Sequence, residues 1–123
     1  MEEEERLKQM AILSGRIAEA EEDLRKNARK IEQNEQTIGE VEQSMQQGKW
    51  LLEAMQTGWS GERAHQFYNQ SSAGLFEAKR HIEHALYEEQ EALQTQRKQL
   101  RVKQDQLQRT YAQLKTRGHE SWD

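Results

Sequence analysis

The sequence of 123 residues contains no cysteine and no proline, and only 7% of its residues are aromatic. Without cysteine, disulfide bonds and thiolate metal sites are excluded. Without proline, nothing in the chain forces a helix to break, and its many Glu, Gln, Lys, Arg, Leu and Ala residues favour long helices. Hydrophobic and charged residues each make up 33% of the chain, so a single domain of this size must have a thin core.

Long hydrophobic runs are also missing. No stretch approaches the ~20 apolar residues that a membrane-spanning helix needs, so we expect no stable membrane insertion. The acidic start, Glu2 to Glu5, is the opposite of the basic start of a secretory signal. We therefore expect a cytoplasmic protein that leaves the cell, if at all, as a folded substrate or together with a partner. The net charge of −4 argues against a nucleic-acid binder.

Apolar residues in the first half of the chain recur at every seventh position. Such a heptad series predicts a helix that packs against another helix. A companion series three residues further on is apolar at both ends but polar in the middle, where Asn27 and Asn34 are expected to specify register at some cost in stability. The main series is Met10, Ile17, Leu24, Ile31, Ile38, Met45, Leu52 and Trp59.

A second heptad series follows Trp59. It begins irregularly and then places Leu86, Leu93, Leu100, Leu107 and Leu114 at strict intervals of seven. The positions four residues after the first four leucines hold Gln90, Arg97, Gln104 and Tyr111, so this apolar stripe is only one leucine wide. Such a narrow stripe predicts a helix that needs neighbours.

Glycines mark the break between the two series. Gly58 is expected to end the first helix with a positive φ, and Ser60 to cap the second. The predicted fold is all-α, a single domain over 1–123 that forms an antiparallel two-helix hairpin and completes a helical bundle with a partner or a second copy. We expect helices over about 3–56 and about 62–117, a turn over 57–61, and a short tail over 118–123.

Charge supports the antiparallel arrangement. Residues 1–23 contain eight acidic and three basic residues, whereas residues 97–117 contain seven basic and one acidic. A turn at Trp59 would bring the two segments side by side, and each would also complement the dipole of its own helix. We therefore expect them to select the orientation, with each surface ion pair contributing at most about 1 kcal/mol.

The stretch from Trp59 to Phe67 contains the motif Trp59-Ser60-Gly61, followed by the small residue Ala64 and by Phe67 at helical spacing. Here the chain resembles the WXG superfamily of type VII secretion, in which Trp and Gly form the turn between two long helices. The resemblance implies that Trp59, Gly61 and Phe67 serve architecture or docking. Independently, we expect the Trp59 ring to pack on Phe67 and Met55, with Gly61 letting the backbone pass close to that ring.

Type VII substrates often carry an aromatic residue followed four residues later by an acid. Only Tyr87 with Glu91 fits that spacing here, well inside the second helix, so an export signal is expected on a partner. In this respect the chain resembles the WXG-like helical partners of LXG-type toxins, found in Gram-positive bacteria. The resemblance implies a targeting chaperone that binds the helical N-terminal domain of a cognate LXG-type toxin, with room for a second small helical protein, for the type VII machinery. The residues expected to bind the partner are Leu86, Leu93, Leu100 and Leu107.

Catalytic, cofactor and metal sites are not expected. The sequence has no phosphate-binding loop or nucleophile elbow, and a helical hairpin offers no sizeable pocket, so we expect no enzyme. His81, His84 and Glu88 could share a helix face with Glu77, but a solvated, charge-paired face is the favoured interpretation. A di-iron bundle would need two Glu-x-x-His motifs, and Glu62 with His65 supplies one.

Two alternatives remain open from the sequence. One is a secreted WXG-type substrate or effector that self-associates into a homodimeric four-helix bundle. The other is a continuous coiled-coil rod in which the turn never forms. The identity of the toxin, the stoichiometry, export of this chain and the role of Trp122 in the C-terminal tail do not follow from the sequence.

Overall fold

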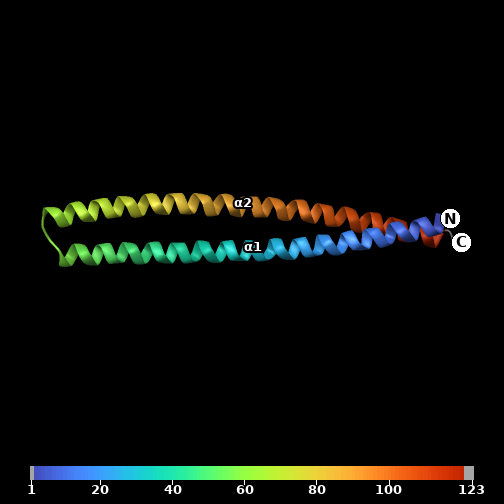
Figure 1. The fold of residues 1–123 in the computed structure, drawn as a ribbon, viewed down its shortest axis with the longest axis horizontal. Coiled ribbons are helices and arrows are strands. Elements are labelled where there is room, and N and C mark those ends of the chain that lie inside the picture. Colours follow the sequence, from blue (N-terminus) through green and yellow to red (C-terminus); the bar gives the residue numbers. More distant parts are fainter. Residues whose placement is uncertain (1, 121–123) are drawn as a thin grey trace. The chain divides into compact units, whose positions relative to one another are not determined.

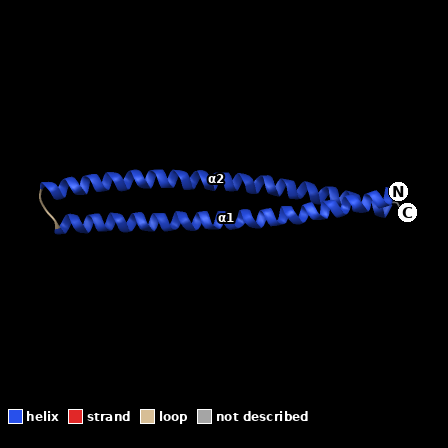
Figure 2. Cartoon of the chain, in the orientation of Figure 1, coloured by secondary structure: helices blue, strands red, loops and turns tan. Residues whose placement is uncertain are grey.

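A computed structural model describes residues 2–120 of the chain. These residues form two helices, α1 (Glu2–Gly58) and α2 (Glu62–Glu120), joined by a short turn (Figure 1). Figure 2 shows helix on both sides of a single loop. The predicted all-α antiparallel hairpin is confirmed, and the continuous rod is excluded.

The helices are slightly longer than predicted. Helix α2 continues through Gly118 to Glu120, so the expected tail of 118–123 does not begin at this glycine. Among the described residues only Gly61 has a positive φ. Gly118 and its described neighbours therefore have a negative φ. A glycine ends a helix only where it adopts the left-handed conformation. Trp122 lies outside the described residues.

Two compact units make up the hairpin, and each contains a segment of both helices. The terminal unit combines residues up to Lys30 with those from Leu93 onward, and the turn unit covers Ile31–Ala92. In the terminal unit the buried hydrophobic residues are Ala20, Leu93 and Leu114. In the turn unit they are Ile31 and Ala64. The thin core predicted from the composition is confirmed.

Two buried asparagines connect the helices. In the terminal unit, Asn27 is 1% exposed, and its Nδ2 donates to the carbonyl oxygen of Leu93 and to Gln96 Oε1, both at 2.9 Å. In the turn unit, Asn34 Nδ2 donates to the carbonyl oxygen of Leu86 at 3.2 Å. Asn34 follows Asn27 by seven residues and Leu86 precedes Leu93 by seven, so both bonds define the same antiparallel register. Their geometry supports the predicted role in register.

Gly61 rather than Gly58 and Ser60 carries the special geometry of the turn. Gly58 lies at the end of α1 without a positive φ, whereas Gly61 has a φ of +112°. The Gly61 carbonyl accepts the first bond of α2 from the His65 amide at 3.0 Å, so Gly61 occupies the cap position expected for Ser60. A Cβ on Gly61 would meet nothing within 4 Å, so the glycine serves its backbone angle and not a close approach to Trp59.

Ion pairs within residues 2–120 all join residues three or four positions apart on one helix, such as Glu22–Arg25 and Asp105–Arg109. The expected acidic and basic segments do lie in the same unit. However, no direct pair between them forms in this part of the chain. Long side chains on the outer faces of two packed helices reach their own neighbours more easily than the opposite helix.

Candidate helix-docking surfaces

The leucines expected to bind a partner line the contact between the two helices. Leu93 is 5% exposed in the terminal unit, and Leu100 and Leu107 are half-buried there. Leu86 is half-buried in the turn unit. The hairpin itself covers most of the Leu93 side chain. The other three keep an exposed edge, which a further helix could cover.

The turn group comes together as predicted for its aromatic pair. The ring centroids of Trp59 and Phe67 lie 5.7 Å apart with the planes tilted by 56°, a favourable arrangement for two aromatic rings. Met55 and Ala64 line the same small hollow. Trp59 nevertheless stays 46% exposed and Phe67 44% exposed. The pair therefore packs the end of the turn unit and also presents an apolar surface there.

Large hydrophobic side chains remain exposed on both helices. On α1, Leu51 is 64% exposed and Trp50 is 60% exposed, and on α2 Phe76 is 62% exposed. Further exposed hydrophobic residues are Leu7, Ile12, Met55, Ile82, Tyr87 and Val102. Scattered apolar side chains are normal on a protein surface, but here the exposed large ones include residues bulkier than most of the core. Leu7, Ile12 and Leu51 thus offer apolar surface that the hairpin leaves uncovered.

A groove of about 540 Å³ follows the contact between α1 and α2 in the turn unit. Its apolar lining comprises Met45, Leu52, Leu75, Phe76 and Tyr68. Its charged lining consists of two acidic and two basic side chains, Glu42, Glu83, Lys49 and Lys79, so the charges balance. Lys79 and Glu83 come within 3.9 Å of each other. The groove thus combines an apolar floor with a neutral rim.

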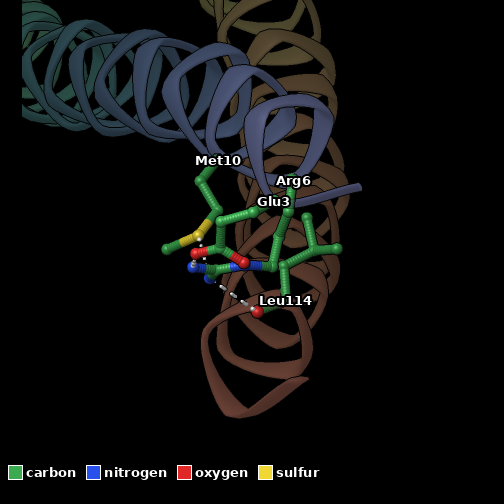
Figure 3. Close-up of polar contacts among 4 residues, drawn as sticks. All are labelled: Glu3, Arg6, Met10 and Leu114. Carbon is green, nitrogen blue, oxygen red and sulfur yellow. Dashed lines mark hydrogen bonds and ion pairs between the residues drawn. The ribbon is translucent and has the colours of Figure 1, made fainter. Parts of the chain in front are cut away.

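Arg6 joins the first turns of α1 to the last turns of α2 in the terminal unit (Figure 3). Its Nη1 donates to the carbonyl oxygen of Leu114 and to Met10 Sδ, both at 3.1 Å, while Glu3 accepts from Nε at 3.0 Å and pairs with Nη2. A Cβ on Gly118 would approach the guanidinium to under 3 Å. Gly118 therefore leaves the space in which Arg6 lies, and we call this arrangement the Arg6 clasp.

Hydrogen bonding lowers the pKa of two carboxylates near the start of α1. Bonds from Arg6 lower the pKa of Glu3, and bonds from Arg25 lower the pKa of Glu22. The reciprocal bond with Glu3 raises the pKa of Arg6. Both acids belong to i, i+3 pairs on the surface, so these shifts reflect local pairing.

The histidine face considered in the sequence is polar and open. His84 Nε2 lies 3.0 Å from Glu88 Oε1, and both side chains are more than two-thirds exposed. His84 lines an open hollow on this face together with His81, Glu77 and Tyr87. No cluster of three potential metal ligands occurs within residues 2–120.

Phe76, Trp50 and Val102 were missed by the sequence analysis, although all three are more than half exposed. They fall between the heptad positions, so a search for periodic apolar residues passes over them. The signal that could have found Phe76 is its place next to Leu75, because two adjacent large apolar residues on a helix cannot both face the same neighbour. Trp50 next to Leu51 and Leu52 gives the same signal.

These features define the class of protein as a helical hairpin with a thin core and uncovered apolar side chains. More specifically, the chain belongs to the family described as a protein of unknown function, DUF3958, which matches residues 5–116. No curated protein and no solved structure is significantly similar to it. Neither helix, over its described residues, includes a segment long and apolar enough to cross a bilayer.

Proposed function

We propose that this chain is a non-enzymatic targeting chaperone or co-secreted adaptor of type VII secretion. It binds the helical N-terminal domain of a cognate LXG-type toxin and presents it to the secretion machinery. The observation that carries the proposal is the mismatch between core and surface. The hairpin buries small or medium hydrophobic residues and leaves Phe76, Leu51 and Trp50 more than half exposed. Further helices would cover these side chains and complete a bundle.

The WXG-like turn adds support through its construction. Gly61 supplies the backbone angle that reverses the chain, and the Trp59–Phe67 pair supplies the apolar end. In this function the Trp59–Phe67 pair first stabilises the turn, and its exposed ring edges also contact the partner.

The test is co-expression with the helical N-terminal domain of an LXG-type toxin encoded beside this chain, followed by size-exclusion chromatography with mass detection. The variants are Leu51→Ser and Phe76→Ser, which remove exposed apolar groups without touching buried ones. The matched controls are Gln47→Ser and Gln70→Ser, exposed polar positions on the same two helices. We expect a stable hetero-complex that the first pair weakens and the control pair leaves intact.

Elution of the two chains as separate species, with this one forming a homodimer, would sink the proposal. That result would favour the second candidate, a secreted substrate that self-associates into a four-helix bundle. The neutral rim of the groove in the turn unit favours this candidate, because a surface with balanced charges can face a copy of itself without net repulsion. A dimer that forms at micromolar concentration without any toxin domain would identify it.

A further inference from the structure

A second groove, in the terminal unit, differs from the first in its charge. It has a volume of about 450 Å³ and lies between the first turns of α1 and the last turns of α2. Its apolar residues are Ile12, Leu13 and Leu114, and its charged residues are Arg16 and Arg117. No carboxylate is found among the described residues that line it. We call it the arginine groove.

The two arginines are available for a ligand. Neither Arg16 nor Arg117 has a hydrogen bond or ion pair within residues 2–120, in contrast to Arg6, Arg25 and Arg109. The acidic segment at the start of α1 was expected to lie beside the basic end of α2 and to select the orientation. Within the acidic segment, Glu3 pairs with Arg6 and Glu22 with Arg25, so these two carboxylates are engaged on their own helix.

One of the three apolar residues that line the arginine groove is exposed. Ile12 is 56% exposed, Leu13 is half-buried and Leu114 is buried at the base. The Arg6 clasp donates to the carbonyl of Leu114, a lining residue of the groove, and so joins the two helix segments there. Leu114 is thus held in place. The exposed residue, Ile12, is β-branched and has little rotamer freedom to lose on binding.

The positions of the arginines specify the ligand. Arg16 follows Ile12 by one turn on α1, and Arg117 follows Gln113 by one turn on α2. Because the two segments are antiparallel, the arginines lie toward opposite ends of the groove. By the register of the Arg6–Leu114 and Asn27–Leu93 bonds, Arg117 lies level with Glu3, so the backbones of the two arginines are about 13 residues, or roughly 20 Å, apart along the helix axis. A helix that fits here needs an apolar stripe with a carboxylate toward each of its ends.

We propose that the arginine groove binds an acidic amphipathic helix. Its apolar stripe packs on Ile12, Leu13 and Leu114, and its carboxylates pair with Arg16 and Arg117. The fork of an arginine side chain suits bidentate pairing with a carboxylate. This inference rests on the proposed function only for the source of the helix, which is the cognate toxin domain. The groove of the turn unit, with balanced charges, carries no such preference.

The binding test uses two synthetic helical peptides of equal length, each capped at both ends. Both have leucine at the a and d heptad positions; one has glutamate and the other lysine at the flanking e and g positions. We expect the full chain to bind the glutamate peptide at least about tenfold more tightly than the lysine peptide, as measured by fluorescence anisotropy. The preference should reverse in Arg16→Glu/Arg117→Glu, and Ile12→Ser should weaken binding of the glutamate peptide.

The matched control is Lys8→Glu/Arg101→Glu, which makes the same change in net charge with one exposed residue on each helix outside the groove. It should change affinity less than threefold, and circular dichroism should show unchanged helicity for all variants. Equal affinity for the two peptides, or an Arg16→Glu/Arg117→Glu variant within twofold of the unmodified chain, would overturn the inference.

The toxin domain separates this inference from the proposed function. A toxin domain that binds the unmodified chain and Arg16→Glu/Arg117→Glu equally well would overturn the arginine groove and leave the proposed function standing. If the glutamate peptide binds through the arginines but no toxin domain forms a complex, the arginine groove stands and the proposed function is overturned.

Discussion

Asn27 shows how a single buried side chain trades stability for uniqueness. Its Nδ2 has two acceptors on α2, whereas its Oδ1 is buried without a hydrogen-bond partner. A buried orphan acceptor costs about 1–3 kcal/mol, which offsets much of what the two donated bonds contribute. A leucine at this position would remove that cost. The carbonyl of Leu93 would retain its place in the α-helix, and Gln96 is exposed and could turn to water.

We therefore predict that Asn27→Leu raises the free energy of unfolding by about 1–2 kcal/mol in urea titrations. With Asn34→Leu added, the two helices should no longer be held in a single register. Spin labels on exposed positions of the two helices should then give a broader or bimodal distance distribution. A loss of stability in Asn27→Leu would show that the asparagine bonds outweigh the orphan oxygen.

Gly61 is the residue whose backbone the turn requires. A φ of +112° is strained for any residue with a Cβ, so Gly61→Ala should lower the free energy of unfolding by roughly 1–2 kcal/mol. Gly58→Ala is the matched control, since Gly58 is helical, has no positive φ and has open space around it. That variant should be neutral or slightly stabilising. Equal effects of the two alanines would contradict the assignment.

At the scale of the elements, the Arg6 clasp couples the start of α1 to the end of α2. Gly118→Ala gains helix propensity worth about 1 kcal/mol but places a methyl group where the guanidinium lies. We predict that Gly118→Ala stabilises an Arg6→Ala background by about 1 kcal/mol and stabilises the unmodified chain less or not at all. A double-mutant cycle measured by urea unfolding gives the coupling. Additive effects would show that Arg6 moves aside freely.

The acidic start of α1 predicts a dependence on pH. The pKa of Glu3 and that of Glu22 lie below the ordinary value of 4.5, so the unfolded chain binds more protons than the folded chain in this range. Their contribution to stability is therefore present above pH 4.5 and is lost as the pH falls through their lowered values. We expect urea unfolding to show this loss below pH 4.5, and Glu3→Gln/Glu22→Gln to reduce it. An unchanged profile in that variant would assign the loss to other carboxylates.

At the scale of the whole molecule, buried and exposed apolar side chains should respond differently to truncation. Leu93→Ala empties a buried position and should cost about 2–4 kcal/mol of unfolding free energy. Phe76→Ala removes a larger side chain that is mostly exposed and should cost less than about 1 kcal/mol. Thermal and urea unfolding of the two variants would check this order. The reverse order would mean that Phe76 is covered in solution, as in a self-associated bundle.

Sequence reasoning was sufficient for the two helices, their turn and their antiparallel pairing. Those features depend on apolar spacing and on glycine placement, both of which are local. It was not sufficient to tell which apolar side chains the hairpin itself covers, since Leu93 is buried while Leu86, Leu100 and Leu107 are half-buried. Which face of a helix remains open depends on how its partner twists around it, as Phe76 shows. The position of the strained glycine was also missed, because Gly58 and Gly61 are equally suited to a turn by type and differ only in backbone angle.

The Asn34 bond to Leu86 restricts how the length of the chain can change. Between this bond and the turn, α1 and α2 must contribute matching lengths, or the loop from Gly58 to Glu62 cannot close. Removing seven residues from one helix alone would preserve its heptad pattern but leave its partner two turns too long. Only paired deletions or insertions of whole heptads, one in each helix at the same level, keep both the register and the turn. Relatives that differ in length between these two positions should therefore differ there in steps of fourteen residues.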